Sequence, residues 1–356
     1  MSLPTEPIGS IPRPDELVES LLAHRKRNLS AEALDQVYDR ALRATIAAFE
    51  DTGSPVITDG EQAKPSFLTY PVEGADNIEP GGIEIPFEAG HTRQLPRLTE
   101  GPFRYETYAV EYLNRAQEYA TVPVKQAVIS ASALSLLYPE EGIDGYSREA
   151  FLDDLVDEVE TDIRRCLEAG AHAVQMDFTE GRLAVKLDPS KDLLRQFVAL
   201  NNRVLDRFSD DERQRIGVHT CPGGDKDSTH SADVDYAELL SLLFEMNAGR
   251  FYMQFASEDE PERVLDIVSE HSHDDQTIFL GVTDVTDPRA ESAEEVRDAI
   301  LQAAEHLPVD RLGTTDDCGF SPFGDDRSTA RRTAFRKIEA RVEGTELASK
   351  ELGLDE

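Results

Sequence analysis

From residue 122 to residue 342 the chain alternates short apolar runs with amphipathic segments, and this alternation restricts the fold more than any other feature. The apolar runs have the length of buried strands, and the segments between them have helical periodicity. The expected strands are residues 122–130, 171–178, 216–221, 250–256, 276–284 and 311–318. The expected helices are residues 147–169, 192–208, 235–247, 261–271, 292–306 and 328–342. Such an alternation predicts parallel βαβ units.

The N-terminal part of the chain extends the same pattern. Residues 29–51 are predicted to form a helix with Ser30 as its N-cap, and residues 55–61 a first strand. This gives seven strands and leaves room for an eighth that the pattern does not locate. Residues 70–101 are rich in glycine, proline and charge, so we expect them to leave the main fold as an inserted loop or hairpin.

The fold class expected from these elements is α/β, a (β/α)8 TIM barrel with an N-terminal extension, formed as a single domain by residues 1–356. No Gly-x-Gly-x-x-Gly loop follows the early strands, which disfavours a dinucleotide-binding fold. Barrel enzymes carry their active sites at the C-terminal ends of the strands. The polar residues at those ends are Asp59, Glu61, Ser130, Asp177, His219, Cys221, Gln254, Thr283, Asp284, Asp317 and Cys318.

Three of these residues form a candidate metal site. His219 and Cys221 are two positions apart on a strand, so their side chains point to the same face. Cys318 follows another strand and could reach the same point across the mouth of a barrel. One histidine and two cysteines would make a three-ligand zinc site with a free fourth position, which is the catalytic arrangement. The alternative is that the cysteines are small buried hydrophobic residues.

The charge of the chain excludes some classes of partner. It has 71 acidic and 36 basic residues, and this net charge of −35 would repel nucleic acid and anionic lipid. The acidic residues are spread through the helical patterns, which suggests a halophilic source. The N-terminal residues do not have the pattern of a signal peptide, no apolar run is long enough to cross a membrane, and the three cysteines fit a reducing compartment. We therefore expect a cytoplasmic location.

Several motifs, taken in order, resemble the catalytic barrel of cobalamin-independent methionine synthase. They are Ile8-Gly9-Ser10-Ile11-Pro12-Arg13, Asp59-Gly60-Glu61, Gln175-Met176-Asp177, His219-Thr220-Cys221, Gly281-Val282-Thr283-Asp284 with Pro288-Arg289, and Asp317-Cys318-Gly319. The resemblance implies methyl transfer from 5-methyltetrahydrofolate to homocysteine at a Zn²⁺ ion. It implies that the metal ligands are His219, Cys221 and Cys318. By the same resemblance the small-molecule thiol would be held by Ile8, Gly9, Ser10, Glu61 and Asp177, the last two as the catalytic residues.

The chain departs from that family at three positions. Gln254 stands where a glutamate is associated with the zinc, Thr286 where a histidine is expected, and Phe178 where an acidic residue is usual. The stretch from His219 to Asp235 is similar to a sister group that includes epoxyalkane:coenzyme M transferase. Epoxide opening by coenzyme M is therefore the alternative activity.

Two further classes remain as alternatives. A metal-free decarboxylase on the same barrel would need an arginine-rich pocket, and the strand ends do not supply one. A non-catalytic binding protein that keeps the barrel is compatible with the three departures. Among the other polar residues, we expect Arg13, Lys64 and Lys125 to be solvated rather than to bind anions, and His230 to lie in a solvated loop.

Overall fold

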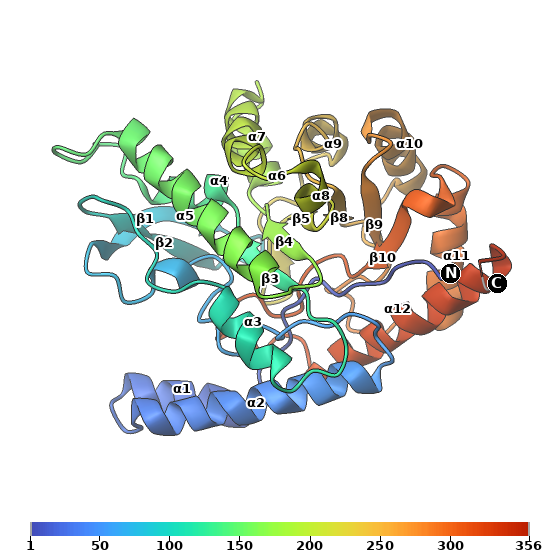
Figure 1. Cartoon of the computed structure of the whole chain (residues 1–356). Helices are drawn as coiled ribbons and strands as arrows, with labels where there is room; N and C mark the ends of the chain where they lie inside the picture. Colours follow the sequence, from blue (N-terminus) through green and yellow to red (C-terminus); the bar gives the residue numbers. More distant parts are fainter. Residues whose placement is uncertain (1, 355–356) are drawn as a thin grey trace.

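The centre of the molecule is a six-stranded parallel sheet, seen in a computed structural model that describes residues 2–354 (Figure 1). The strands follow the order β10-β9-β8-β5-β4-β3. Their bounds are β3 Gln126–Ile129, β4 Val174–Asp177, β5 Ile216–Thr220, β8 Arg250–Met253, β9 Thr277–Gly281 and β10 Leu312–Thr315. Every position of β3, β4, β5 and β10 is buried, as is typical of parallel strands covered on both faces. The α/β fold with a parallel sheet is therefore confirmed.

Two short segments continue the sheet at its edges, each through one parallel bridge. Ile57 pairs with Val124 beside β3, and Thr5 pairs with Thr314 in β10. At the second bridge the Glu6 backbone N–H donates to the Thr314 carbonyl at 3.0 Å. Together with the six strands, these two segments give eight neighbouring strand positions, or staves, among residues 2–354. The position that the sequence pattern did not locate is the N-terminal stretch around Thr5. It is too short and too polar to show strand periodicity.

Hydrogen bonds connect the segments that follow these two edges. The Thr58 hydroxyl donates to the Gly9 carbonyl at 2.9 Å, and the Ile11 N–H donates to the Gly60 carbonyl at 3.0 Å. The eight staves thus have the arrangement of a (β/α)8 barrel. Its C-terminal mouth carries the ends of β4, β5, β8 and β10 together with the Ile8–Ser10 stretch.

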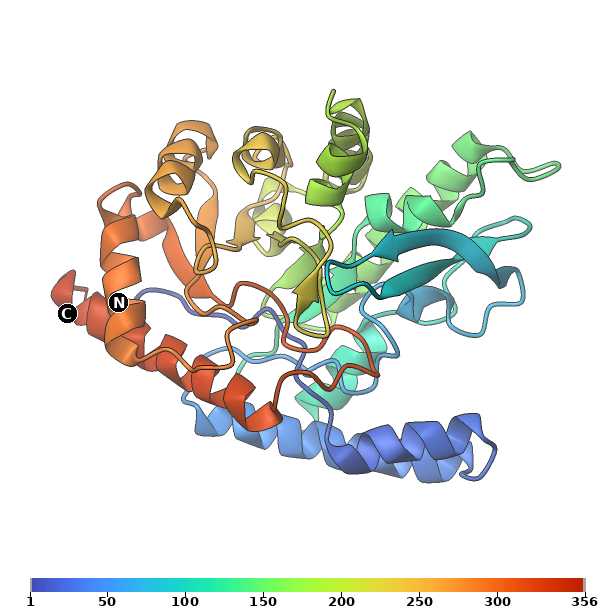
Figure 2. The same cartoon turned by 180° about the vertical axis from the view of Figure 1, so that it is seen from behind.

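Helices surround the sheet, as two opposite views of the molecule show (Figures 1 and 2). They are α1 Asp15–Arg25, α2 Ala31–Asp51, α3 Val110–Gln117, α4 Ala131–Leu134, α5 Arg148–Glu168, α6 Gly181–Leu187, α7 Asp192–Leu205, α8 Asp210–Arg213, α9 Ala237–Leu243, α10 Pro261–His271, α11 Ala293–Ala304 and α12 Arg331–Glu351. Three 3₁₀ turns lie at Tyr70–Val72, Ser135–Leu137 and Val309–Arg311. Among these described helices none is long and apolar enough to cross a membrane.

Local capping explains where several helices begin. Ser30 accepts a hydrogen bond from the Ala33 N–H at the start of α2, as the sequence predicts. Ser147 does the same for α5, and Ser292 forms a capping box with Glu295 at the start of α11. Each such cap stabilises its helix by about 1 kcal/mol.

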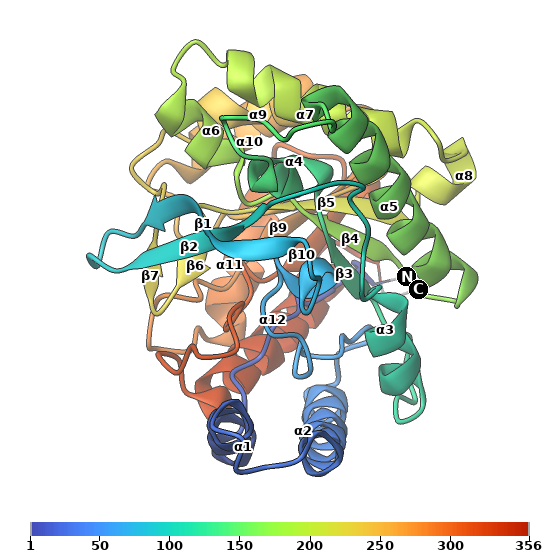
Figure 3. The same ribbon diagram turned by 90° about the vertical axis from the view of Figure 1, so that its left-hand side faces the viewer.

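Two antiparallel hairpins stand apart from the sheet. The larger joins β1 (Ile78–Pro86) to β2 (Thr92–Leu98), and the smaller joins β6 (Gly224–Asp225) to β7 (Ser228–Thr229). They lie side by side (Figure 3), and the Glu88 N–H in the turn of the larger hairpin donates to the Thr229 carbonyl at 3.0 Å. The smaller hairpin directly follows Cys221, so the larger one packs against the segment that carries a candidate ligand.

The last helix is longer than the sequence pattern predicts. Its predicted end was residue 342, whereas α12 continues to Glu351. The apolar stripe ends early because the buried face of α12 is polar further along. It carries Arg341, whose guanidinium is 3.1 Å from Asp316, and Ser349, which accepts from the Leu3 N–H at 3.0 Å. Helix α1 was not predicted because only Leu17 and Val18 of its eleven residues are buried.

Candidate metal centre

The three candidate ligands meet at the mouth of the barrel. His219 lies in β5, Cys221 follows the end of the same strand, and Cys318 follows the end of β10. Their ligand atoms all lie within 4.8 Å of one another, and all three side chains are buried. The Cys221 and Cys318 sulfurs are 2.9 Å apart although 97 positions separate them in the chain. Both cysteines are free thiols.

The chemistry of this cluster fits a soft divalent cation. The neighbouring Cys221 thiol and burial together raise the pKa of Cys318 well above its usual value. Two thiolates this close are stable together only if a positive charge lies between them. His219 Nδ1 is 3.2 Å from the Tyr252 carbonyl, and its Nε2 is buried with no hydrogen-bond partner among the described residues. A backbone carbonyl on Nδ1 leaves the Nε2 lone pair free, which is the usual state of a metal-binding histidine.

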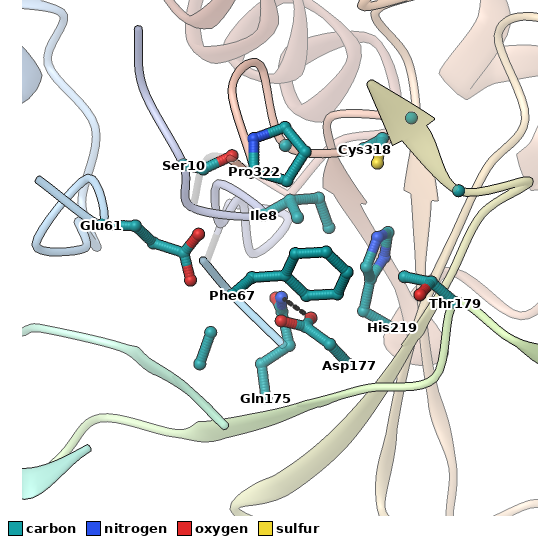
Figure 4. Close-up of a pocket in the computed structure, with 14 residues that line it drawn as sticks. Ile8, Ser10, Glu61, Phe67, Gln175, Asp177, Thr179, His219, Cys318 and Pro322 are labelled. Carbon is teal, nitrogen blue, oxygen red and sulfur yellow. Dashed lines mark hydrogen bonds between the residues drawn. The ribbon is translucent and has the colours of Figure 1, made fainter. Parts of the chain in front are cut away.

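A buried pocket of about 370 Å³ opens beside the cluster, and we refer to it as the inner pocket (Figure 4). It is lined by Ile8, Ser10, Glu61, Phe67, Ala127, Gln175, Asp177, Thr179, His219, Gly223, Gly224, Cys318, Gly319 and Pro322. Most of this lining is apolar, and the charged exceptions are Glu61 and Asp177. In Figure 4 the Glu61 carboxylate lies across the pocket from the His219 ring and the Cys318 sulfur.

Asp177 projects into the inner pocket from the end of β4. Its Oδ1 accepts a hydrogen bond from Gln175 Nε2 at 2.7 Å. Burial raises the pKa of the Asp177 carboxyl to about 6, and the nearby Glu61 acts in the same direction. An ammonium group bound beside the two carboxylates would relieve this electrostatic cost.

Glu61 is held in a defined orientation by a buried lysine. Lys64 Nζ lies 3.1 Å from Glu61 Oε1 and donates to the Ala127 carbonyl at 2.8 Å. Burial lowers the Lys64 pKa, but Glu61 and Asp59 outweigh burial and raise it above its usual value. The backbone of Glu61 has a φ of 54°, a conformation that costs energy for a residue with a side chain. Lys64 therefore fixes the carboxylate without itself lining the pocket.

The Ile8–Ser10 stretch forms another wall. Ile8 and Ser10 line the inner pocket, and Gly9 lies between them with a φ of 151°. The Ser10 hydroxyl accepts from the Ser321 N–H at 3.2 Å, and a Cβ on Gly319 would lie 2.2 Å from the Ser10 oxygen. This close approach explains why glycine follows Cys318. Among the described residues, the N–H groups of Gly9 and Ser10 donate no hydrogen bond.

A second, larger cavity of about 1110 Å³ lies beside the same cluster, and we refer to it as the outer pocket. It is lined by Glu88, Ala89, Pro222, Gly224, Asp227, Ser228, Thr229, Ala232, Gln254, Ser257, Asp284, Val285, Thr286, Asp317 and Cys318. Cys318 and Gly224 line both pockets. The cluster therefore lies between two cavities, an arrangement suited to the reaction of two different ligands.

Gln254 directly follows β8, beside the candidate metal ligands, and lines the outer pocket. Its N–H donates to the Thr220 carbonyl at 3.3 Å, which places it next to Cys221. Its Nε2 donates to the Ser257 hydroxyl at 2.7 Å, and that hydroxyl donates to Asp317 at 2.6 Å. The remaining amide oxygen of Gln254 is buried and has no partner among the described residues.

The loop that carries Cys221 is fixed from outside by the β1–β2 hairpin. Arg93 donates to both oxygens of Asp225, at 2.6 and 2.9 Å, and His91 Nε2 lies 2.9 Å from the same carboxylate. Asp225 itself is buried. A Cβ on Gly223, which has a φ of 71°, would lie 1.8 Å from the His230 ring. These contacts position the segment between Cys221 and Asp225.

The expectation that three basic side chains are solvated is wrong. Arg13, Lys64 and Lys125 are buried rather than solvated. Arg13 donates to backbone carbonyls, including that of Glu61 at 2.7 Å. Lys125 is 3.7 Å from the Glu6 carboxylate, and burial lowers its pKa to about 7. The long apolar part of each side chain can be buried when the charged group at its end hydrogen-bonds to a carbonyl or pairs with a carboxylate.

His230 is also buried, not solvated. Its Nδ1 lies 2.7 Å from the Ser231 hydroxyl, and its ring packs against Phe87. Burial lowers its pKa to about 4, so the ring is neutral at neutral pH. The sequence could not show this because the covering residue, Phe87, comes from the distant hairpin.

Sequence reasoning missed some residues of the site. Phe67, Thr179 and Pro322 line the inner pocket but carry no local pattern that distinguishes them. Glu180 is buried near Asp177 and accepts a hydrogen bond from Ser130 at 2.7 Å. Burial raises the pKa of Glu180 to about 7. Its position after the end of β4 was the available signal.

Comparisons with known proteins show the family of this chain. The family model described as "Cobalamin-independent synthase, Catalytic domain" matches residues 3–338. A methionine synthase of Saccharolobus solfataricus is 23% identical over 355 residues, covering 98% of this chain and 96% of the relative. One from Sulfurisphaera tokodaii is 22% identical over 351 residues, covering 98% and 94%.

Solved structures show the same fold. A B12-independent methionine synthase from Shewanella sp. W3-18-1, in complex with selenomethionine, has a TM-score of 0.78 at 20% identity and covers 99% of this chain and 100% of that one. A putative vitamin-B12-independent methionine synthase from Listeria monocytogenes has a TM-score of 0.72 at 20% identity and covers 97% and 98%. At this identity the likeness concerns the fold.

Proposed function

Because the chain belongs to the cobalamin-independent synthase catalytic-domain family, we propose that it is a zinc-dependent thiol S-methyltransferase that converts homocysteine to methionine. The observation that carries the proposal is the convergence of His219, Cys221 and Cys318 between two cavities. The inner pocket would hold the thiol substrate and the outer pocket the methyl donor. The curated relatives, which are named methionine synthases, support the same reaction.

His219 Nε2 and the two cysteine sulfurs would hold the zinc ion. Two sulfurs and one imidazole are a typical catalytic ligand set, with a position left for a substrate. A bound zinc ion would supply the positive charge that keeps an incoming thiol in its nucleophilic thiolate form. The protein would hold His219 in the correct tautomer through the Tyr252 carbonyl.

The inner pocket favours an amino-acid thiol over coenzyme M. Asp177 and Glu61 present two carboxylates to the ligand, and no lysine or arginine is among the described residues that line the pocket. The ammonium group of homocysteine would pair with these carboxylates, whereas the sulfonate of coenzyme M would be repelled. Coenzyme M chemistry is therefore the second candidate.

The rest of the amino acid also finds complementary groups. The free N–H groups of Gly9 and Ser10 are suited to bind the substrate carboxylate. Ile8, Phe67 and Pro322 would pack against the methylene groups of the side chain. The Shewanella relative was solved with selenomethionine, an amino acid of the same length as the proposed product, which supports this assignment.

The test separates metal binding from methyl transfer. The purified chain is analysed for zinc and then assayed with homocysteine and methyl iodide, a small neutral donor that does not depend on the outer pocket. We expect zinc in a one-to-one ratio and methionine as product, with both lost in Cys221→Ser and Cys318→Ser. The loss of activity should exceed about 100-fold, since changes even beyond the ligands cost 10–100-fold. Cys166→Ala is the matched control, because Cys166 is a buried cysteine of helix α5 outside the cluster.

The alternatives predict different results. Faster alkylation of coenzyme M by an epoxide than of homocysteine by methyl iodide would favour the second candidate. A protein that binds zinc and homocysteine but alkylates neither thiol would be a binding protein. Full activity without metal would contradict the proposal.

A further inference from the structure

Phe67 is a partly exposed phenylalanine in the inner pocket. Twelve of the fifteen phenylalanines of the chain are buried in the core, so a phenyl ring that stays partly exposed calls for an explanation. Phe67 is the one phenylalanine among the described residues that line the inner pocket. In Figure 4 its ring is drawn between the Glu61 carboxylate and the His219 ring. The exposed part of the ring therefore faces the space proposed for the thiol substrate.

The backbone that carries this ring is fixed to the loop that follows Cys318. The Phe67 N–H donates to the Pro322 carbonyl at 3.1 Å. The preceding residue, Ser66, pairs with Phe323 in an antiparallel bridge. The ring is thus attached to the same loop as a candidate metal ligand, and backbone pairing sets its position relative to the metal site.

The back of the ring is supported by other side chains. Phe323 packs against Phe67 edge to face, with the ring centroids 5.5 Å apart. The Arg93 guanidinium lies 4.2 Å from the Phe323 ring centroid, and Arg93 also donates to the buried Asp225 carboxylate. This packing opposes retreat of the ring from the pocket, because retreat would disturb the hairpin that fixes the Cys221 loop. Phe67 is therefore a supported wall of the inner pocket.

Both ends of a bound amino-acid thiol would be held at fixed positions. The sulfur would lie at the metal site and the ammonium group at Glu61 and Asp177. Lys64 positions the first carboxylate and Gln175 the second. A side chain that is longer than the distance between two fixed ends has to bend sideways. The Phe67 ring occupies space beside this path, so it opposes such a bend.

Resting on the proposed function, we propose that Phe67 is the specificity-determining residue that selects the thiol by the length of its side chain. The ring leaves room for the straight two-methylene chain of homocysteine and excludes the bend of a chain with one more methylene group. In an apolar pocket one methylene group changes kcat/KM by about 10- to 200-fold. Cysteine, with one methylene group fewer, is rejected for a different reason, because it is too short to reach both ends.

The test compares three amino-acid thiols on the zinc-loaded full chain, with methyl iodide as the common donor. They are cysteine, homocysteine and 2-amino-5-mercaptopentanoate, whose side chains have one, two and three methylene groups. Formation of the S-methylated amino acid gives kcat/KM. The dissociation constant of each thiol is measured separately on the cobalt-substituted protein, from the change in its cobalt–thiolate absorption. We expect the unaltered chain to prefer homocysteine over both other thiols by at least about tenfold.

Variants of Phe67 connect this preference to the ring. We expect Phe67→Ala to lower the preference for homocysteine over the three-methylene thiol by about tenfold or more, and Phe67→Leu by a smaller factor. Both kcat/KM and the dissociation constants should show the change. The preference over cysteine should not fall, because removal of the wall does not lengthen a short thiol.

Phe335→Ala is the matched control for these variants. Phe335 is also partly buried and packs edge to face on a second phenylalanine, but it lies in α12 outside both pockets. We expect it to leave the length preference unchanged. Because each preference is a ratio measured within one protein, a partly unfolded variant does not distort it.

The outcomes separate the two proposals. No methylation of any thiol, together with no spectral change when thiols are added, would contradict the proposed function itself. Methylation of homocysteine with an unchanged length preference in both Phe67 variants would overturn only the role of the ring. The same holds if the unaltered chain accepts the longer thiol as well as homocysteine, if Phe67→Ala improves cysteine as much as the longer thiol, or if Phe335→Ala shifts the preference equally.

Discussion

The inner and outer pockets share Cys318 and Gly224 but differ in how their charges are held. In the inner pocket the charged groups are buried, and Glu61 is fixed by Lys64 and Asp177 by Gln175. In the outer pocket Asp284 is only partly buried and Glu88 is exposed. A rigid, buried site discriminates by exact partners, whereas an exposed one selects mainly by overall charge. The thiol should therefore be the more strictly selected of the two substrates.

The largest effect is expected from removal of the lysine that supports the inner pocket. Lys64→Met would leave the Glu61 carboxylate buried without its ion pair, which costs about 3–5 kcal/mol of unfolding free energy. Denaturant unfolding measures this loss. Glu61→Gln/Lys64→Met is the matched double variant and should recover part of the stability. Equal stability of Lys64→Met and the unaltered protein would contradict the assigned role.

A buried lysine below the inner pocket gives a test by pH. Lys125 Nζ has no hydrogen-bond partner among the described residues, and burial lowers its pKa to about 7. The unfolded chain, with an ordinary lysine pKa near 10.4, binds more protons than the folded chain between these values. Stability should therefore rise with pH from about 7 to about 10, by up to about 2 kcal/mol between pH 7 and 9.

Lys125→Met supplies the control for this pH effect. The difference in unfolding free energy between the two proteins should favour the unaltered chain more at pH 9 than at pH 7. A difference that is constant over this range would show that Lys125 does not titrate there.

A smaller effect is expected from the carboxylate that would bind the ammonium group. Asp177→Asn keeps the shape of the side chain but removes one charge from the inner pocket. We expect KM for homocysteine to rise about tenfold to 100-fold, with a smaller change for 3-mercaptopropionate, a thiol without an ammonium group. If both thiols are affected equally, Asp177 does not recognise the amine.

The smallest effect concerns the hairpin that fixes the Cys221 loop. Arg93→Gln removes both hydrogen bonds to Asp225, and we expect zinc affinity to fall by about tenfold through loss of loop order. Arg97→Gln is the matched control, because Arg97 lies on the same strand but pairs with the exposed residues Glu79 and Glu141. Zinc affinity that falls equally in both variants would indicate a general effect of the hairpin.

The sequence predicted the parts of the fold that depend on local pattern. Six strands and most helices show in the alternation of apolar runs, and Ser30, Ser147 and Ser292 cap the helices that follow them. The stave at Thr5 could not be predicted, because it joins the sheet by one bridge to a residue more than 300 positions away. The end of α12 was missed because Arg341 and Ser349 are buried through distant partners.

The same division holds for the site. The His219-x-Cys221 spacing and the strand ends were enough to name the residues that the structure brings together. The burial of Lys64, Lys125 and His230 was not predictable, since it depends on covering elements from elsewhere in the chain. The size and the lining of the two pockets could not be predicted either, because a cavity results from packing and has no sequence pattern.

The most direct test of the account is X-ray absorption of the zinc-loaded protein before and after homocysteine is added. We expect the zinc coordination shell to contain two sulfurs, from Cys221 and Cys318, and a nitrogen from His219, and to gain a third sulfur when homocysteine binds. A shell that lacks both cysteine sulfurs, or one whose sulfur content does not change at saturating homocysteine, would contradict it.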